Sequence, residues 1–244
     1  MPISLERGAT SKMRLKVDWT HPVPPKRDPN SGTVAAGPLP LGDALDELWR
    51  GDDGRPLLVL RECNLCEGSD GALFSRSLAN DKTMLMTKWF RTVKLPPHVA
   101  EKGHTFHNVF QGYEFEHGWP HFFLLAHKGA EPVAFTGRQT QSQLWRGMFD
   151  VLEQRYSKDP KRALKKWLSL LDKYDMLDSR EVQLKEQLLQ ARAADGPTSS
   201  RSKKLAEKLD ELKDERSKLE AQEKKVRELG LQKMPAVEDK VAAK

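Results

Sequence analysis

The chain has 244 residues, a mass of 27.8 kDa and 38% hydrophobic residues, which is enough for one sizeable core but not for two. No stretch approaches the roughly 18 unbroken apolar residues that a membrane-spanning helix needs. The N-terminal residues also lack the apolar segment of a signal peptide. We therefore expect one globular domain with extensions, no membrane partner, and a cytoplasmic location unless an export signal has been removed.

The formal net charge of +6 comes mainly from the C-terminal part of the chain. Residues 161–244 contain 21 Lys and Arg against 16 Asp and Glu. A dense mixture of both signs is typical of solvated helix faces, and no RNA- or DNA-reading motif accompanies it. Nucleic-acid binding is therefore not expected.

The first 40 residues have the pattern of an N-terminal extension. Residues 13–19 alternate apolar and polar side chains, which predicts one half-buried strand. The stretch over 20–40 is rich in Pro, Gly and Ser, which predicts a linker without regular structure.

Residues 41–156 mix helix-like and strand-like patterns, as in an α/β domain. Residues 41–51 predict a short amphipathic helix that stops at Gly51, and 55–60 form an apolar run suited to a buried strand. Later patterns predict a helix over 71–80, a long strand over 83–95, two strands joined by a Gly-containing turn within 120–137, and an amphipathic helix over 139–156 that begins at Thr140 or Ser142.

Residues 160–232 predict a helical tail. Apolar residues recur there at spacings of three and four, and the pattern is interrupted once, at the sequence "ADGPTSS". Arg216 and Glu223 fall in seam positions, so the apolar stripe is imperfect. The pattern predicts an antiparallel helical hairpin or one arm of a coiled coil, followed by a disordered C-terminus over 233–244. Because neither helix is apolar enough to be stable alone, a coiled-coil partner or a second copy of the chain is implied.

The two cysteines, Cys63 and Cys66, follow the predicted buried strand directly. A thiol between a strand and a helix start lies near unpaired backbone N–H groups and the positive end of the helix dipole, which lower its pKa. Cys63 would be the attacking thiol. Cys66, three residues later, would then resolve the mixed disulfide.

A metal site and a pair of unreactive thiols are the alternatives for these cysteines. The further zinc ligands would be His104, His107, His117 and His121. Their spacing does not suit a compact zinc finger, and a strand that leads into the pair favours redox chemistry. No Gly-rich phosphate loop and no Ser/His/Asp signature stands out, so we expect no cofactor and neither hydrolase nor nucleotide-binding activity.

The order strand, Cys-x-x-Cys, helix, strand, Pro-led pair of strands and closing helix resembles the thioredoxin-like family over about residues 41–156. The residues that carry the resemblance are "CNLC" and "GWPHFFLLAHKGAEPVAFTGRQTQSQLWRGMF". It implies a three-layer α/β domain with a central mixed sheet. It also implies that Pro120 packs against the cysteines and that the backbone of Trp119 pairs with the substrate.

Two neighbours of the motifs are predicted modulators of the thiols. Glu62 stands where thioredoxin has Trp, and its carboxylate would either disfavour the Cys63 thiolate by repulsion or accept a proton from Cys66. His121, directly after Pro120, would influence the ionisation of the dithiol if it lies nearby.

The sequence thus predicts a thiol–disulfide oxidoreductase that acts on protein or small-molecule disulfides. The electron donor and the direction of electron flow are not encoded in any recognisable pattern. The alternative is a non-catalytic adaptor that uses a thioredoxin-like fold and its coiled-coil tail to bind proteins.

Overall fold

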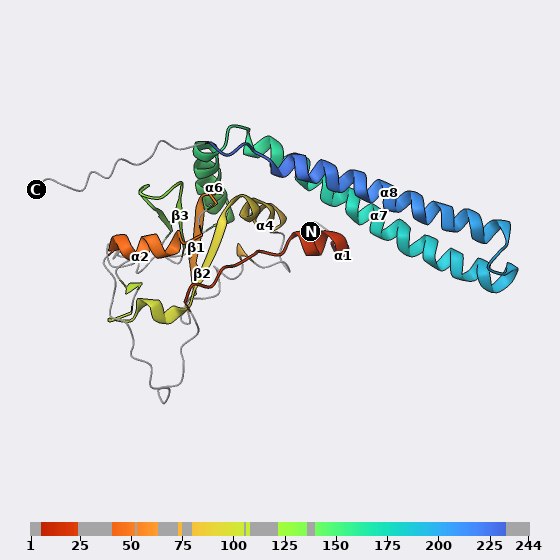
Figure 1. Cartoon of the computed structure of the whole chain (residues 1–244), viewed down its shortest axis with the longest axis horizontal. Coiled ribbons are helices and arrows are strands. Elements are labelled where there is room, and N and C mark those ends of the chain that lie inside the picture. Colours follow the sequence, from red (N-terminus) through yellow and green to blue (C-terminus); the bar gives the residue numbers. More distant parts are fainter. Residues whose placement is uncertain are drawn as a thin grey trace, which may run out of the picture.

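The computed structural model of the chain describes residues 6–23, 41–51, 53–62, 73–74, 80–104, 106–107, 122–135 and 140–232. These residues form an α/β domain around a four-stranded mixed sheet, and a long helical hairpin projects from it (Figure 1). The predicted α/β class with a C-terminal helical hairpin is confirmed. No helix among the described segments is long and apolar enough to cross a membrane.

The sheet has the strand order β2-β1-β3-β4. Its strands are β1 (Leu57–Arg61), β2 (Arg91–Leu95), β3 (Phe122–Leu125) and β4 (Val133–Phe135). β1 is parallel to β2 and antiparallel to β3, and β4 is antiparallel to β3. β1 is buried at every position, which explains why its first four residues, Leu57 to Leu60, are a continuous apolar run and not an alternating one.

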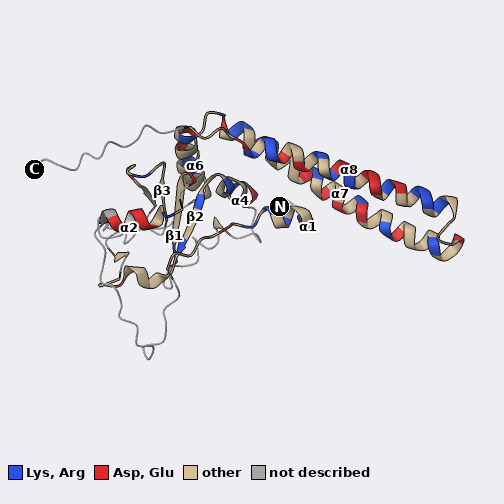
Figure 2. Cartoon of the chain, in the orientation of Figure 1, with Lys and Arg blue, Asp and Glu red and all other residues tan. Residues whose placement is uncertain are grey.

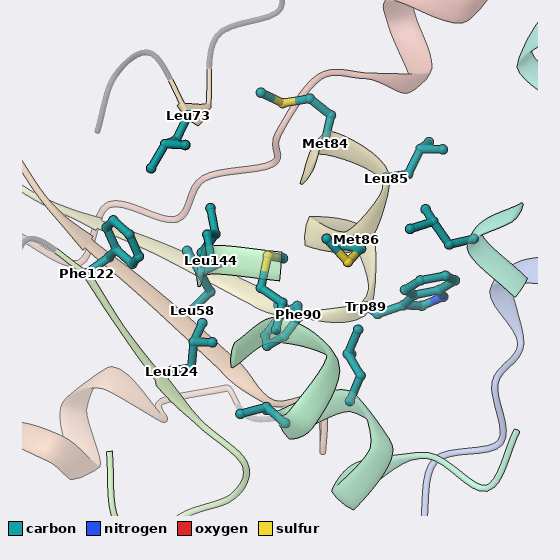
Figure 3. Close-up of a cluster of buried hydrophobic side chains, with 14 of the residues drawn as sticks. Leu58, Leu73, Met84, Leu85, Met86, Trp89, Phe90, Phe122, Leu124 and Leu144 are labelled. Carbon is teal, nitrogen blue, oxygen red and sulfur yellow. The ribbon is translucent and has the colours of Figure 1, made fainter. Parts of the chain in front are cut away.

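Helices cover both faces of this sheet. α2 (Leu41–Leu48) packs on the face that carries Leu57 and Val59. α4 (Asp81–Met86) and α6 (Gln141–Arg155) pack on the opposite face with Leu58, and Figure 3 shows side chains from all three elements in one apolar cluster. The predicted helix over 41–51, the predicted buried strand and the predicted β3–β4 pair are confirmed.

α6 begins where the sequence predicted. The Thr140 hydroxyl accepts a hydrogen bond from the backbone N–H of Gln143, and the Gln143 side chain accepts one from the backbone N–H of Thr140. This reciprocal capping box fixes the first turn of the helix. The apolar stripe of α6, which includes Leu144 and Met148, then faces the sheet.

α7 (Pro160–Asp195) and α8 (Ser200–Arg227) form the hairpin, and they reverse direction at Gly196, whose φ is +83°. Figure 2 shows acidic and basic residues mixed along both helices. The first turns of α7 belong to the same apolar cluster as the sheet, because Trp167 packs against Trp89 with ring centroids 5.3 Å apart. The hairpin is therefore rooted in the domain core.

The predicted strand over residues 13–19 is wrong. α1 (Ala9–Arg14) occupies its first part, and a short extended stretch then reaches Thr20, which forms one parallel bridge to Val93 of β2. The Thr20 backbone is held by the Thr92 carbonyl at 2.9 Å and by the Lys94 N–H at 2.9 Å. Contacts of α1 with α7 and α8, described below, decide its helical form and outweigh the local alternation.

The predicted long strand over 83–95 is wrong in its first half. The chain forms α4, then a short 3-10 helix, η1 (Thr87–Trp89), and only then β2. Met84, Leu85 and Met86 are all buried, and Met and Leu are good helix formers. Of the predicted helix over 71–80, the structure describes only 73–74 and Asn80, and of the predicted linker only 20–23.

Candidate functional site

The two predicted sequence motifs lie outside the described residues. Cys63 and Cys66 belong to the first motif; Trp119, Pro120 and His121 belong to the second. The structure describes the chain on one side of each motif. Glu62 follows β1 and precedes Cys63, and β3 begins at Phe122, which follows His121.

These two flanking residues lie at the same edge of the sheet. Phe122, the first residue of β3, pairs with Leu60 near the end of β1. Arg61 pairs with Leu95, the last residue of β2, and the Glu62 N–H donates to the Leu95 carbonyl at 2.8 Å. We call the edge formed by Glu62, Leu95 and Phe122 the carboxyl edge, because β1 and β2 both end there.

The charge of Glu62 is partly balanced at this edge. Its carboxylate forms an ion pair with Lys94 of β2, and its side chain is 43% exposed. Arg61 is buried, and its guanidinium donates to the Glu62 carbonyl at 3.4 Å. Because a nearby cation offsets a carboxylate, this ion pair weakens the repulsion that Glu62 would exert on a neighbouring thiolate. It also engages the carboxylate that was predicted as a proton acceptor.

His104 is held in a local ring cluster after β2. Its ring contacts His98 edge-on, with centroids 5.1 Å apart, and its Nδ1 accepts the Phe106 N–H at 3.1 Å. Burial lowers the pKa of His104, and the nearby His98 lowers it further. A neutral His104 suits this packing role.

His107 is also accounted for by local structure. It is buried, and its Nδ1 lies 3.0 Å from the Ala100 carbonyl oxygen. The other two predicted ligands, His117 and His121, lie outside the described residues. Within the part of the chain that the structure describes, no three His, Cys, Asp or Glu side chains are grouped as metal ligands.

A second polar site, which the sequence suggested only as an imperfection of the seam, surrounds Glu223 of α8. Its carboxylate accepts hydrogen bonds from Trp167 Nε1 at 3.2 Å, from the Tyr174 hydroxyl at 3.1 Å and from Arg14 Nε at 2.7 Å. Glu223 is 7% exposed. Burial raises the pKa of Tyr174 to about 12, although the nearby Arg14 opposes this shift, so the hydroxyl stays a donor.

Arg216, the other polar residue in a seam position, also binds groups of opposite charge. Its guanidinium pairs with Asp178 at 3.0 Å and with Glu181 at 2.7 Å. The Asp178 carboxylate also accepts from the backbone N–H and the hydroxyl of Thr10 in α1. The two polar seam positions therefore form the place where α1 docks.

Arg7, just before α1, completes this contact. Its guanidinium forms ion pairs with Asp81 of α4 and with Asp172 and Asp175 of α7, all at 2.7 to 2.8 Å. The N-terminal segment thus ties the hairpin to α4 of the domain. The acidic spacing on α7 was visible in the sequence, but its partner lies more than 160 residues away.

An open groove of about 920 Å³ lies at the root of the hairpin. Arg55, Trp89 and Tyr156 of the domain line it together with Arg227 and Leu231. Arg55 precedes β1 and Trp89 precedes β2, so the groove and the hairpin root lie at the amino ends of these strands. The carboxyl edge is at their other end.

In comparisons with known proteins, no family model, no curated protein and no solved structure matches this chain.

Proposed function

We propose that this chain is a thioredoxin-like protein that exchanges thiols and disulfides through Cys63 and Cys66. The observation that carries the proposal is the carboxyl edge. The chain leaves β1 at Glu62 toward the cysteines and enters β3 at Phe122 directly after Trp119-Pro120-His121, and both described residues lie at this one edge.

The order of the elements supports the same proposal. Along the chain come β1, the cysteine pair, α4, the parallel strand β2, the antiparallel pair β3–β4, and α6 as the closing helix. The resemblance to the thioredoxin-like family rests on the same succession of element types, with the helix predicted over 71–80, whereas α4 begins at Asp81. Helices on both faces of a mixed sheet are what that resemblance implies.

In the proposed reaction the Cys63 thiolate attacks one sulfur of a substrate disulfide. The substrate bond breaks, a mixed disulfide forms, and the departing substrate thiolate takes a proton from water. The Cys66 thiolate then attacks Cys63, which releases the second substrate thiol and leaves a Cys63–Cys66 disulfide. Two electrons pass to the substrate, and an external dithiol donor must return them.

The test is reduction of insulin disulfides with dithiothreitol as the electron donor. The wild-type chain should accelerate the reaction, and Cys63→Ser should abolish the acceleration without loss of folding. If Cys66→Ser is first reduced and the dithiothreitol is removed, it should instead accumulate a mixed disulfide between Cys63 and insulin, which intact-mass measurement detects. If the wild-type chain is inert in this assay, the redox proposal fails.

A titration of the dithiol against glutathione buffers would give its reduction potential, and so the favoured direction of electron flow. The metal alternative has its own measurement. One equivalent of zinc in the purified chain, lost in Cys63→Ser, would replace the redox proposal.

The second candidate function is a non-catalytic adaptor that binds proteins through the hairpin. The observation in its favour is that the hairpin projects away from the domain (Figure 1) and exposes the apolar residues Val182 and Leu189. The adaptor would be favoured if the wild-type chain did not reduce insulin and if the wild type and Cys63→Ser bound a partner equally well.

A further inference from the structure

The α7/α8 hairpin is built differently in its two halves. Near the root, α1 lies against it as a third helix. Beyond α1 the hairpin projects away from the domain (Figure 1), and its apolar cluster of Leu188, Ala191 and Leu205 involves only residues of α7 and α8.

The seam of α7 follows a heptad pattern, with Tyr174, Leu177, Leu184, Leu188 and Ala191 turned toward α8. Residues seven positions apart then return to the same side of the helix. The positions of Asp175 and Asp178, which hold α1, therefore recur outward along α7 at 182 and 185 and again at 189 and 192.

The chemistry of these positions changes along the helix. Near the root, Asp175 accepts the Gly8 N–H at 2.9 Å and Asp178 accepts the Thr10 N–H at 2.8 Å. Farther out the Asp175 position becomes Val182 and Leu189, which are 57% and 67% exposed. The Asp178 position becomes Lys185 and Arg192, both exposed.

The equivalent positions of α8 also lose their acidic residue with distance from the root. Glu220 faces Arg14 of α1 at 3.5 Å. Seven and fourteen residues earlier, the equivalent positions are Lys213 and Ala206, exposed and half-buried respectively. We define the distal face as Val182, Lys185, Leu189, Arg192, Ala206 and Lys213. Val182 and Leu189 form its outer flank on α7, and the basic residues Lys185, Arg192 and Lys213 lie closer to the seam between the two helices.

We infer that the distal face binds an acidic amphipathic helix of a partner protein, which continues the line of α1 as a third helix of the bundle. α1 carries basic residues, including Arg14, and docks where the hairpin is acidic. The distal face has the reverse charge, so electrostatic complementarity selects a helix with acidic residues beside its apolar stripe. The inference does not depend on the dithiol.

Two exposed ion pairs already involve this face. Lys185 pairs with Glu181 at 2.6 Å, and Lys213 pairs with Asp210 at 2.7 Å. Exposed pairs of this kind contribute little to stability, so both lysines can turn to a partner carboxylate. If a second copy of the hairpin docked on this face, Lys185 and Arg192 would lie against the same basic residues of the other copy, and the like charges would repel.

The test uses a fluorescent synthetic helical peptide of about three heptads, with Leu along its stripe and Glu on both flanks. A matched peptide carries Lys in place of every Glu. By fluorescence anisotropy at low ionic strength, the full chain should bind the Glu peptide at least about tenfold more tightly than the Lys peptide. Val182→Ser with Leu189→Ser should weaken binding of the Glu peptide about tenfold or more. Lys185→Glu with Arg192→Glu should reverse the preference.

Matched controls lie on the other side of the hairpin. Met176 is 65% exposed, and Met176→Ser should leave binding unchanged. Lys204 and Lys208 line a separate groove with Gln187, so Lys204→Glu with Lys208→Glu changes the net charge equally without touching the distal face. Circular dichroism should give the same helix content for all variants.

Three results would overturn the inference. The first is equal binding of the two peptides, and the second is an equal loss of binding in the Lys204/Lys208 control. The third is self-association of the wild-type chain in sedimentation that Val182→Ser with Leu189→Ser abolishes, because the occupant would then be a second copy.

Discussion

The sheet and the hairpin are stabilised by different forces. β1 lies between two apolar clusters, and Leu57, Leu58 and Val59 have no exposed surface. The hairpin has a narrow leucine seam, interrupted by Arg216 and Glu223, whose charges are satisfied by α1 and α7. Charge screening by salt weakens partly exposed ion pairs, whereas it does not act on buried apolar contacts. Changes in ionic strength or in these charges should therefore affect the docking of the hairpin, and they should leave the stability of the sheet unchanged.

The contact between the two regions gives the largest expected effect. Trp167 is 1% exposed and packs on Trp89 of the domain. Trp167→Ala should lower the free energy of unfolding by about 3–5 kcal/mol, because it removes a large buried side chain and leaves a cavity at the root. Urea denaturation followed by circular dichroism measures this loss.

Val182→Ala on the same helix is the control for Trp167→Ala. Val182 is 57% exposed, so this change should alter stability by less than about 0.5 kcal/mol. If Trp167→Ala cost no more than Val182→Ala, the hairpin would not be rooted in the domain core.

The second prediction concerns the polar part of the hairpin. Glu223→Ala leaves the Arg14 guanidinium, Trp167 Nε1 and the Tyr174 hydroxyl without their shared acceptor. Removal of one partner of a largely buried ion pair is costly, so stability should fall by about 3 kcal/mol.

A double-mutant cycle with Arg14→Met separates the ion pair from the loss of packing. The two changes together should cost clearly less than the sum of the single changes, because the uncompensated charge is then gone. Additive costs would mean that α1 contributes nothing to the hold on Glu223.

The sequence predicted the parts of the fold that local patterns encode. β1, the β3–β4 pair and α6 were predicted because a buried run, a Gly-containing turn and a Thr140 cap are local signals. The strand predicted over 83–95 failed although the information was present: Met84, Leu85 and Met86 favour a helix, whereas Thr92 and Val93 favour a strand.

The docking of α1 could not be predicted in this way. Arg7 and Asp175 are separated by 168 residues, and the sequence around each of them contains no signal that identifies its partner. Arg216 and Glu223 were noticed as seam exceptions, but their partners Thr10 and Arg14 come from the far end of the chain. The predicted dithiol also stays a prediction, since its residues lie outside the described segments.

The third prediction tests the sheet side of the comparison. Gly147 of α6 lies beside Phe135 of β4, and a Cβ at this position would come within 2.5 Å of Phe135 Cζ. Gly147→Ala forces the ring of Phe135 to move and should cost about 2 kcal/mol despite the better helix propensity of Ala. Thermal unfolding should show this loss equally at low and high salt, and a strong salt dependence would contradict apolar packing as its cause.

The smallest effect should be the one that depends on pH. Burial opposes ionisation of Asp178, but hydrogen bonds from Thr10 and the charge of Arg216 outweigh it, so its pKa lies below the ordinary value of 3.8. A carboxylate with a depressed folded-state pKa stabilises fully above its ordinary pKa, and this contribution is lost as the pH falls through the folded-state value. Asp178→Asn should therefore cost roughly 1 kcal/mol at neutral pH and almost nothing once the pH lies well below the lowered folded-state pKa of Asp178. The stability difference from wild type, measured by urea denaturation across this range, should shrink on acidification. If this stability difference did not change with pH, the contribution of Asp178 to the docking of α1 would come from packing and not from its charge.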